Sequence, residues 1–205
     1  MPIEKKLNIL KEGLLLRSEH LDRTVQVDCY VPDELPAAQE VSLLLINDGQ
    51  DLGRMGLAGI LADLYGRGVL SPLICAGIHA GAHRKMEYGT AGHANYQGWG
   101  VKADDYTRFL FDELLPLLGR RYGAPGFREK AFAGFSLGAL SALDIVWRHP
   151  QEFTCAGLFS GSFWWRKKDK DDPGFDEATD RIMHAAVRAG GYYPWLRFFF
   201  ECGTK

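Results

Sequence analysis

The sequence contains no continuous apolar run of about 20 residues, the length that a membrane-spanning helix needs. Its first residues, MPIEKKLNILKEG, also lack the apolar centre of a secretory signal peptide. We therefore expect a cytoplasmic protein without a membrane partner, although a leader removed by processing would leave no trace.

Cysteine is scarce and scattered. The chain has four cysteines, far apart and without a C-x-x-C pair: Cys29, Cys75, Cys155 and Cys202. Most of them have apolar neighbours. This spacing predicts buried free thiols rather than disulfides or a metal site.

An excess of charge of one sign is also absent. The 24 basic and 26 acidic residues leave a formal net charge of -2, and no run of lysine or arginine is long enough to follow a phosphate backbone. Nucleic acid is therefore not an expected partner. The chain has no internal repeat and no low-complexity segment, so its 205 residues predict a single domain, 1–205.

Short apolar runs alternate with helical patterns along the chain, which predicts one doubly wound α/β domain with a mostly parallel sheet. The first two expected strands read as an antiparallel edge pair. The expected strands are 13–17, 24–31, 41–46, 73–78, 130–135, 155–159 and 196–202. Helices are expected near 57–64, 104–118, 137–147 and 180–189, with a kink at Pro116 in the second.

One serine stands between two glycines in the stretch AFAGFSLGAL, at the spacing Gly134-x-Ser136-x-Gly138. A nucleophile elbow needs a strand that ends abruptly, a strained turn that holds the serine, and a helix that starts at once. The segments 130–135 and 137–147 supply the strand and the helix in that order. The setting favours Ser136 as a nucleophile, and the alternative is a serine that only caps the helix.

A serine nucleophile also needs hydrogen-bond donors for the oxyanion. The backbone N–H of Leu137 follows the nucleophile directly. The loop after the strand 41–46, Asn47-Asp48-Gly49-Gln50, is the usual source of a second donor, and we take the N–H of Gln50 as the candidate. An ordinary Asp-Gly turn explains this loop equally well.

Five stretches together resemble the family called "Putative esterase", of the α/β-hydrolase fold: INDGQDL, GIHAGAHRKMEYGTAG, AFAGFSLGALSALDIVWRHP, FSGSFWW and FFFECGT. This family includes siderophore (enterochelin-type) esterases, feruloyl esterases, esterase D and mycolyltransferases. The resemblance runs from about Leu14 to Lys205. It implies a mostly parallel central sheet with helices on both faces, Ser136 as nucleophile, an oxyanion hole at Leu137 and Gln50, and small-molecule acyl esters as substrates.

The triad acid and base are not identified in this sequence. In α/β-hydrolases they follow the serine in the order acid, then histidine. Only His149 and His184 follow Ser136, and both lie in or just after helical patterns, where a surface or capping histidine is expected. Asp144 is likewise expected to be a surface or capping residue. We therefore expect the acid, the base and the last strand and helix beyond Lys205, which would make the domain 1–205 incomplete at its C-terminus.

A metal site is the alternative for His79, His83 and Glu87, which are spaced i, i+4, i+8, with His93 nearby. On a helix these side chains would share one face and could bind zinc. Several glycines interrupt the segment, so a long loop over 80–102 is expected instead, and neither a metal nor another cofactor. The resemblance places Arg84 and Glu87 in a loop near the site, where they bind substrate or, as we favour, hold the loop by a salt bridge.

The aromatic group Phe163, Trp164 and Trp165 either lines an acyl or aryl pocket or packs in the core. The candidates for a substrate loop are thus His79, Arg84, Glu87 and Trp164. Three function classes remain: a serine carboxylic-ester hydrolase, an acyltransferase with the same nucleophile, and a binding domain without catalysis. The oligomeric state stays open.

Overall fold

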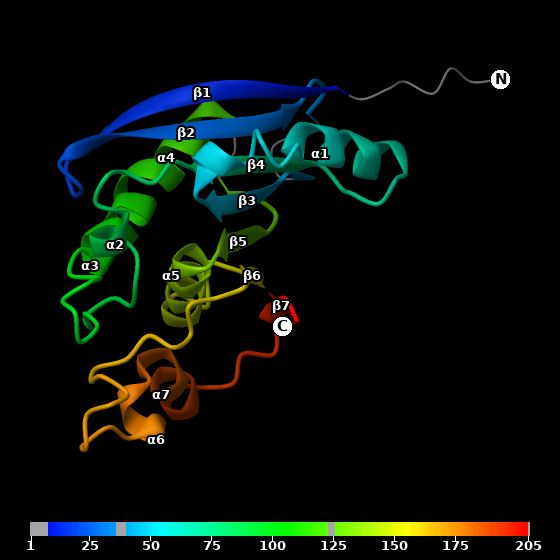
Figure 1. The fold of residues 1–205 in the computed structure, drawn as a ribbon. Helices are drawn as coiled ribbons and strands as arrows, with labels where there is room; N and C mark the ends of the chain where they lie inside the picture. The colour runs from blue at the N-terminus through cyan, green and yellow to red at the C-terminus, as the bar shows by residue number, and fades with distance from the viewer. Residues whose placement is uncertain (1–7, 36–39, 123–125, 205) are drawn as a thin grey trace.

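A single mixed sheet organises the molecule. The computed structural model describes residues 8–35, 40–122 and 126–204. Seven strands lie in the order β1-β2-β4-β3-β5-β6-β7 (Figure 1). They are β1 (Ile9–Ser18), β2 (Arg23–Pro32), β3 (Ser42–Asn47), β4 (Leu73–Ile78), β5 (Lys130–Phe135), β6 (Cys155–Phe159) and β7 (Arg197–Glu201).

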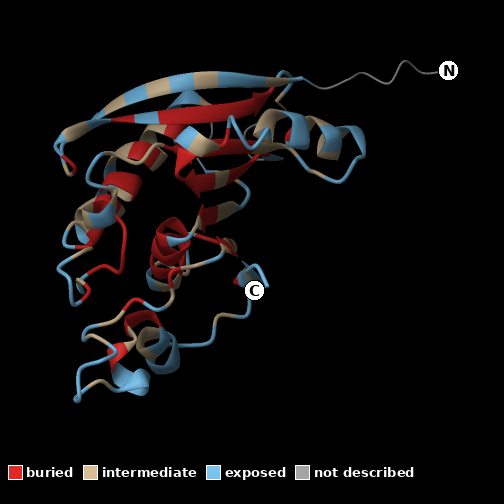
Figure 2. Cartoon of the chain, viewed as in Figure 1, coloured by how far each residue is buried: buried red, intermediate tan, exposed pale blue. Residues whose placement is uncertain are grey.

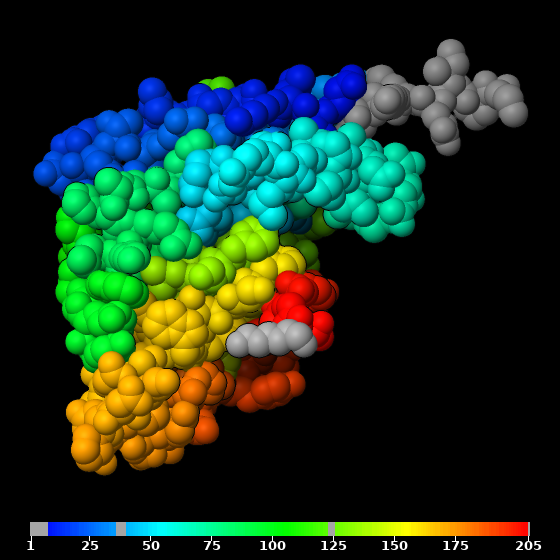
Figure 3. Space-filling view, viewed as in Figure 1, coloured from blue at the N-terminus to red at the C-terminus, as the bar shows by residue number. Residues whose placement is uncertain are grey.

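The strand directions match the expected fold class. β1 pairs with β2 and β2 with β4 in antiparallel fashion, as predicted for the first two strands, and the other neighbours are parallel. The carboxyl ends of β4, β3, β5, β6 and β7 therefore meet along one edge of the sheet. In the space-filling view the colours pass down the molecule nearly in chain order, from the blue β1–β2 pair to the orange and red C-terminal segments (Figure 3).

Helices cover both faces of the sheet. α1 (Leu57–Gly66) packs on one face, and the helical region 103–121 and α5 (Leu137–Arg148) pack on the other (Figure 1). The strand β3 shows why: Leu43 and Leu45 belong to the core under the large helical layer, whereas Leu44 and Ile46 face the core under α1. Alternate side chains of a strand point to opposite faces, so a continuous apolar run requires cover on both.

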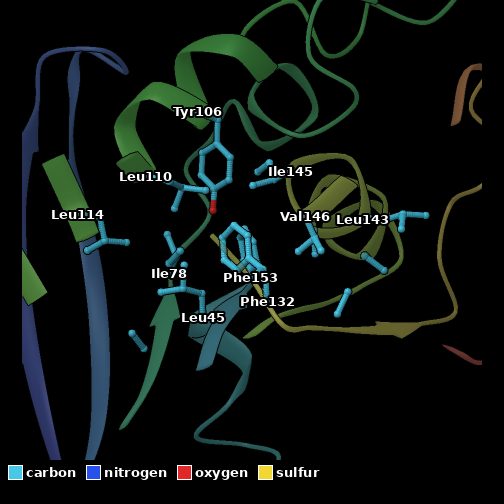
Figure 4. Packing of buried hydrophobic residues seen from close by; sticks show 14 of the residues in the cluster. Leu45, Ile78, Tyr106, Leu110, Leu114, Phe132, Leu143, Ile145, Val146 and Phe153 are labelled. Carbon is cyan, nitrogen blue, oxygen red and sulfur yellow. The ribbon is translucent and has the colours of Figure 1, made fainter. Parts of the chain in front are cut away.

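The main core lies between the central strands and α5. Figure 2 shows β2, β3, β4 and most of α5 as buried, in contrast to the outer surface of α1. In Figure 4, Phe132 and Phe153 lie side by side close to Val146 of α5, and the two rings stack with centroids 6.1 Å apart. No helix within residues 8–35, 40–122 and 126–204 has the length and apolar character needed to cross a bilayer.

Two expected helices differ from the structure. The predicted helix 104–118 consists of α3 (Ala103–Arg108), a π-helical stretch (Phe109–Leu114) and α4 (Leu115–Arg121). Pro116 has no N–H to donate to the carbonyl of the residue four positions earlier, so one α-helical hydrogen bond is missing. The wider π-helical turns lie just before this proline.

The predicted helix 180–189 is broken at Arg181, which separates α6 (Glu177–Asp180) from α7 (Ile182–Ala189). Arg181 is extended because it forms a β-bridge with Arg166. Its neighbour Ile182 donates to the Trp165 carbonyl at 3.1 Å. This pairing outweighs the local helical pattern.

The four cysteines are free, as expected, but only Cys29 and Cys75 are buried. Burial raises the pKa of the Cys29 thiol to about 11 and that of the Cys75 thiol to about 12. Cys155 is half-buried and Cys202 is exposed. The expectation of buried thiols is therefore wrong for these two, which lie at the thinly covered end of the sheet.

Candidate active site

Ser136 occupies a strained turn between β5 and α5. Its backbone angles are φ 53° and ψ -119°, a region that residues other than glycine rarely adopt. The serine is exposed, whereas Leu137 beside it is buried. The Ser136 side chain makes no capping hydrogen bond to α5. Its hydroxyl is thus presented at the carboxyl edge of the sheet instead of closing the helix end.

Two glycines allow this turn to be tight. A Cβ atom on Gly134 would lie 2.8 Å from the Ala139 nitrogen and closer still to the Gly138 carbonyl. A Cβ atom on Gly138 would lie 2.9 Å from Asp48 Oδ2 and 3.0 Å from Asn47 Cβ. The helix therefore starts against its own strand and against the loop after β3, which only glycine permits.

The loop after β3 is also tightly folded. Asp48 has φ 62°, and residues Gly49–Asp51 form one 3-10 turn. A Cβ atom on Gly49 would lie 2.8 Å from the Ile78 nitrogen. Gln50, at the tip of the turn, is exposed. Within the described part of the chain, neither the Gln50 N–H nor the Leu137 N–H donates to another protein group, so both donors are free at the ends of two neighbouring parallel strands.

An ion pair holds this loop in place. Arg84 binds the buried carboxylate of Asp48 through two bonds, Nε to Oδ1 at 2.6 Å and Nη2 to Oδ2 at 2.7 Å. Its hydrogen bond with Asp48 raises the pKa of Arg84 above the usual range. The Arg84 guanidinium also lies 5.0 Å from the centre of the Tyr88 ring, and the Asp48 N–H donates to the Tyr88 hydroxyl at 3.3 Å.

Glu87 and His79 have partners on the β1–β2 side. Glu87 accepts two bonds of 2.7 Å from Arg23. His79 Nε2 lies 2.8 Å from Asp28 Oδ2, on the far side of β4 from the elbow. Arg84 and Glu87 therefore pair with different segments, and the side chains of His79 and Glu87 have different partners, Asp28 and Arg23. Within the residues that the structure describes, no cluster of His, Cys, Asp or Glu is arranged to hold a metal ion.

The predicted loop 80–102 is irregular except for the single-turn helix α2 (Arg84–Glu87) and one β-bridge between Thr90 and His93. One of its anchors is Asp144 on α5, which is 2% exposed and accepts the Ala91 N–H at 2.8 Å. Burial raises the pKa of this carboxyl. The expectation of a surface or capping role for Asp144 is wrong, because the carboxylate fixes the loop to α5.

The aromatic group after β6 divides between core and surface. Trp165 is fully buried, and its ring lies against Gly89 and Gly100, where an added Cβ would be 3.0 Å away. Phe163 lines a hollow of about 290 Å³ together with Phe200 of β7. Trp164 is 44% exposed. It is thus the most exposed member of the group.

The histidines after Ser136 stand apart from it. His149 ends α5, where its ring lies 4.4 Å from that of Phe111, and His184 is exposed on α7. The acid and base expected beyond Lys205 lie outside the described residues. Among those described, the Ser136 hydroxyl has one hydrogen-bond partner, Ser162, with 3.2 Å between the two Oγ atoms.

Sequence reasoning missed Ser162 as a neighbour of Ser136. The stretch FSGSFWW is quoted above only for its resemblance and its aromatic residues. The sequence could have predicted this contact, because Ser136 follows β5 and Ser162 follows β6. The carboxyl ends of neighbouring parallel strands lie at the same edge of the sheet.

Several known proteins that resemble this chain are named esterases or hydrolases. The structure superposes on the enterobactin esterase of Shigella flexneri, determined in the presence of enterobactin, with a TM-score of 0.71 and 25% identity over 93% of this chain and 45% of that one. A siderophore hydrolase from Aspergillus nidulans shares the fold, with a TM-score of 0.69 and 18% identity over 94% of this chain and 68% of that one.

A curated relative is the endo-1,4-beta-xylanase/feruloyl esterase of Xylanibacter ruminicola, which is 28% identical over 119 residues. The match takes in 57% of this chain, and this chain spans only 15% of that protein's length. The family model described as "Putative esterase" matches residues 18–205. Together with the mostly parallel sheet of an α/β-hydrolase, this match shows that the chain belongs to the "Putative esterase" family.

Proposed function

We propose that the protein is a carboxylic-ester hydrolase with Ser136 as its nucleophile. The observation that carries the proposal is the strained and exposed backbone of Ser136, at φ 53°, between β5 and α5. Such strain costs about 1–3 kcal/mol and persists where the surroundings enforce it, typically at functional sites. In an α/β-hydrolase this turn raises the serine Oγ above the sheet.

In the proposed reaction the Ser136 Oγ forms a bond to the acyl carbon, and its proton passes to a general base. The carbonyl oxygen becomes an oxyanion, for which the free N–H groups of Leu137 and Gln50 are the donors. The alcohol leaves with a proton, and water then attacks the acyl-enzyme and returns a proton to Ser136. None of the six histidines, all within the described residues, is hydrogen bonded to Ser136, and the base and acid after Lys205 stay a prediction.

The substrate class is proposed from the named relatives. Esters of the enterobactin and feruloyl types are the first substrates to test, because proteins with these names resemble the chain. The exposed Trp164 is a candidate contact for an aromatic acyl group, since aromatic rings stack favourably.

The test uses the full-length protein and a short activated ester such as p-nitrophenyl acetate. We expect an initial burst of nitrophenol and a mass increase of one acetyl group on Ser136. The variant Ser136→Ala should lose the burst and lower turnover by roughly 10³-fold or more. Ser160→Ala is the matched control, because Ser160 is also exposed and has φ 47° but lies at the end of β6.

A burst that survives Ser136→Ala would contradict the proposal. Loss of turnover on chelation, with Ser136→Ala still active, would instead support a metal site. Adding an alcohol or a sugar acceptor distinguishes an acyltransferase from a hydrolase. With the acceptor present, an acyltransferase forms the new ester faster than it forms the free acid. Absence of any acyl adduct on Ser136 would favour a binding domain.

A further inference from the structure

The end of β6 and the residues that follow it hold the backbone of Ser136 through two hydrogen bonds. The Ser136 N–H donates to the Phe159 carbonyl at 2.9 Å, and the Ser162 N–H donates to the Ser136 carbonyl at 3.0 Å. The Ser162 hydroxyl then lies 3.2 Å from the Ser136 hydroxyl. Phe159 and Ser162 therefore position the main chain and the side chain of Ser136.

Ser162 is itself well fixed. It is 4% exposed, in contrast to the exposed Ser136. Its carbonyl accepts the N–H of Trp165 at 3.2 Å, and the Trp165 side chain is fully buried against the loop 80–102. The buried tryptophan thus anchors the turn that carries Ser162. The position of the Ser162 hydroxyl relative to Ser136 is therefore fixed.

The direction of the bond between the two hydroxyls follows from their burial. Within the described chain, the Ser162 Oγ has no other hydrogen-bond partner. If Ser136 donated, the proton of the buried Ser162 would have no acceptor, which is costly. If Ser162 donates, its proton is satisfied, and the Ser136 proton stays free for another acceptor.

We propose that Ser162 is a positioning residue that donates a hydrogen bond to the Ser136 Oγ and leaves the Ser136 proton free for a general base. The proposal rests on the proposed function, because it gives Ser162 a role only if Ser136 is the nucleophile. The hydrogen bond from Ser162 holds the Ser136 side chain in one rotamer before attack, when the reacting atoms must already be aligned. No bond to Ser162 forms or breaks in the reaction.

The test compares the full-length wild type with Ser162→Ala, which removes the hydroxyl and keeps both backbone hydrogen bonds. The measured quantities are kcat, KM and the second-order rate of labelling by a fluorophosphonate, with the labelled residue identified by mass spectrometry. We expect kcat and the labelling rate to fall about 10-fold with KM unchanged, since only alignment is lost. Ser160→Ala, in the same segment but without contact to the Ser136 hydroxyl, should behave as wild type.

Two further variants keep the test decisive. Ser162→Thr retains a hydroxyl and should restore most of the labelling rate. Ser162→Cys keeps the volume with a weaker donor and should lie between wild type and Ser162→Ala; it replaces the alanine variant if that one does not fold.

An unchanged labelling rate in Ser162→Ala, or in Ser162→Cys where this takes its place, overturns the proposal. An increased rate also overturns it, because Ser136 would then be the donor. Failure of the wild type to label at Ser136 contradicts the proposed function itself, so the two failures are distinguishable.

Discussion

Asn47 and Gly138 are separated by 91 residues in the chain, yet the Asn47 side chain donates a 2.8 Å hydrogen bond to the Gly138 carbonyl. Asn47 ends β3, and Gly138 lies in the first turn of α5. The Tyr106 hydroxyl in turn donates to Asn47 Oδ1 at 2.6 Å. The loop that carries Gln50 is therefore fixed relative to the turn that carries Ser136.

Asn47→Ala should destabilise the protein by about 2–3 kcal/mol, because it removes one acceptor of the fully buried Tyr106 hydroxyl and the donor to the Gly138 carbonyl. Urea unfolding followed by fluorescence measures the change. Tyr106→Phe is the comparison, and it should destabilise the protein by about 1–2 kcal/mol, because it leaves the buried Asn47 Oδ1 without this donor. The double variant should be less destabilised than the sum of the two, and strict additivity would contradict the network.

Replacing Arg84 by methionine should destabilise the protein by about 2 kcal/mol, because the Asp48 carboxylate, 8% exposed, loses its counter-charge. Ester turnover should also fall, since Asp48 precedes the turn that bears Gln50. Arg84→Lys should be intermediate, because lysine cannot form the paired bonds. Arg54→Met is the matched control: Arg54 pairs with Asp51 at the surface, and its loss should change the unfolding free energy by less than about 0.5 kcal/mol.

Gly134→Ala should lower the unfolding free energy by about 3 kcal/mol or prevent folding, since its methyl group would meet the Gly138 carbonyl and the Ala139 nitrogen. Gly59→Ala tests the same change in open space within α1, where an added Cβ meets nothing within 4 Å. That variant should be neutral or more stable by up to about 1 kcal/mol. Similar unfolding free energies for both variants would argue against a tight elbow.

The buried carboxylate of Asp28 should make stability depend on pH below about 4. Burial alone would raise its pKa, but hydrogen bonds from Lys11, His79 and Gln26 lower it below the ordinary value. Below an unfolded pKa of about 3.9, the unfolded state binds more protons than the folded state, so this contribution is lost as the pH falls through the folded pKa. Urea midpoints measured between pH 6 and pH 3 should fall more steeply for the wild type than for Asp28→Asn.

The control for this pH dependence is Asp63→Asn, which removes a carboxylate that is exposed and paired with Arg67 on one helix. Its midpoints should follow those of the wild type. Parallel curves for the wild type and Asp28→Asn would show that Asp28 does not carry the effect.

Local patterns predicted the strands and the elbow well. The structure has β4, β5 and β6 with the bounds expected from their apolar runs, because a strand covered on both faces must be apolar throughout. The Gly-x-Ser-x-Gly spacing likewise predicted a turn between β5 and α5, and the turn is there. These features depend on neighbouring residues, which a sequence displays directly.

Contacts between distant segments were not predictable in the same way. The partners of Arg84 and Glu87 are Asp48 and Arg23, 36 and 64 residues away, and a charged residue carries no periodic signal that points to its partner. Arg181 leaves its predicted helix for the same reason, since its bridge to Arg166 is a tertiary contact that overrides local propensity. The role of Asp144 also depends on a loop far from it in sequence.

The hydrogen bonds with Phe159 and Ser162 make the conformation of Ser136 depend on the docking of β6. β5 and α5 alone contain the whole Gly-x-Ser-x-Gly motif, but the strained conformation is secured by hydrogen bonds with residues that come more than twenty positions later. A chain in which β6 has not yet docked can relax the turn and present an ordinary serine, because strain of this kind lasts only while its surroundings impose it. If Ser136 is the nucleophile proposed above, its covalent modification during refolding should therefore begin only when β6 has docked.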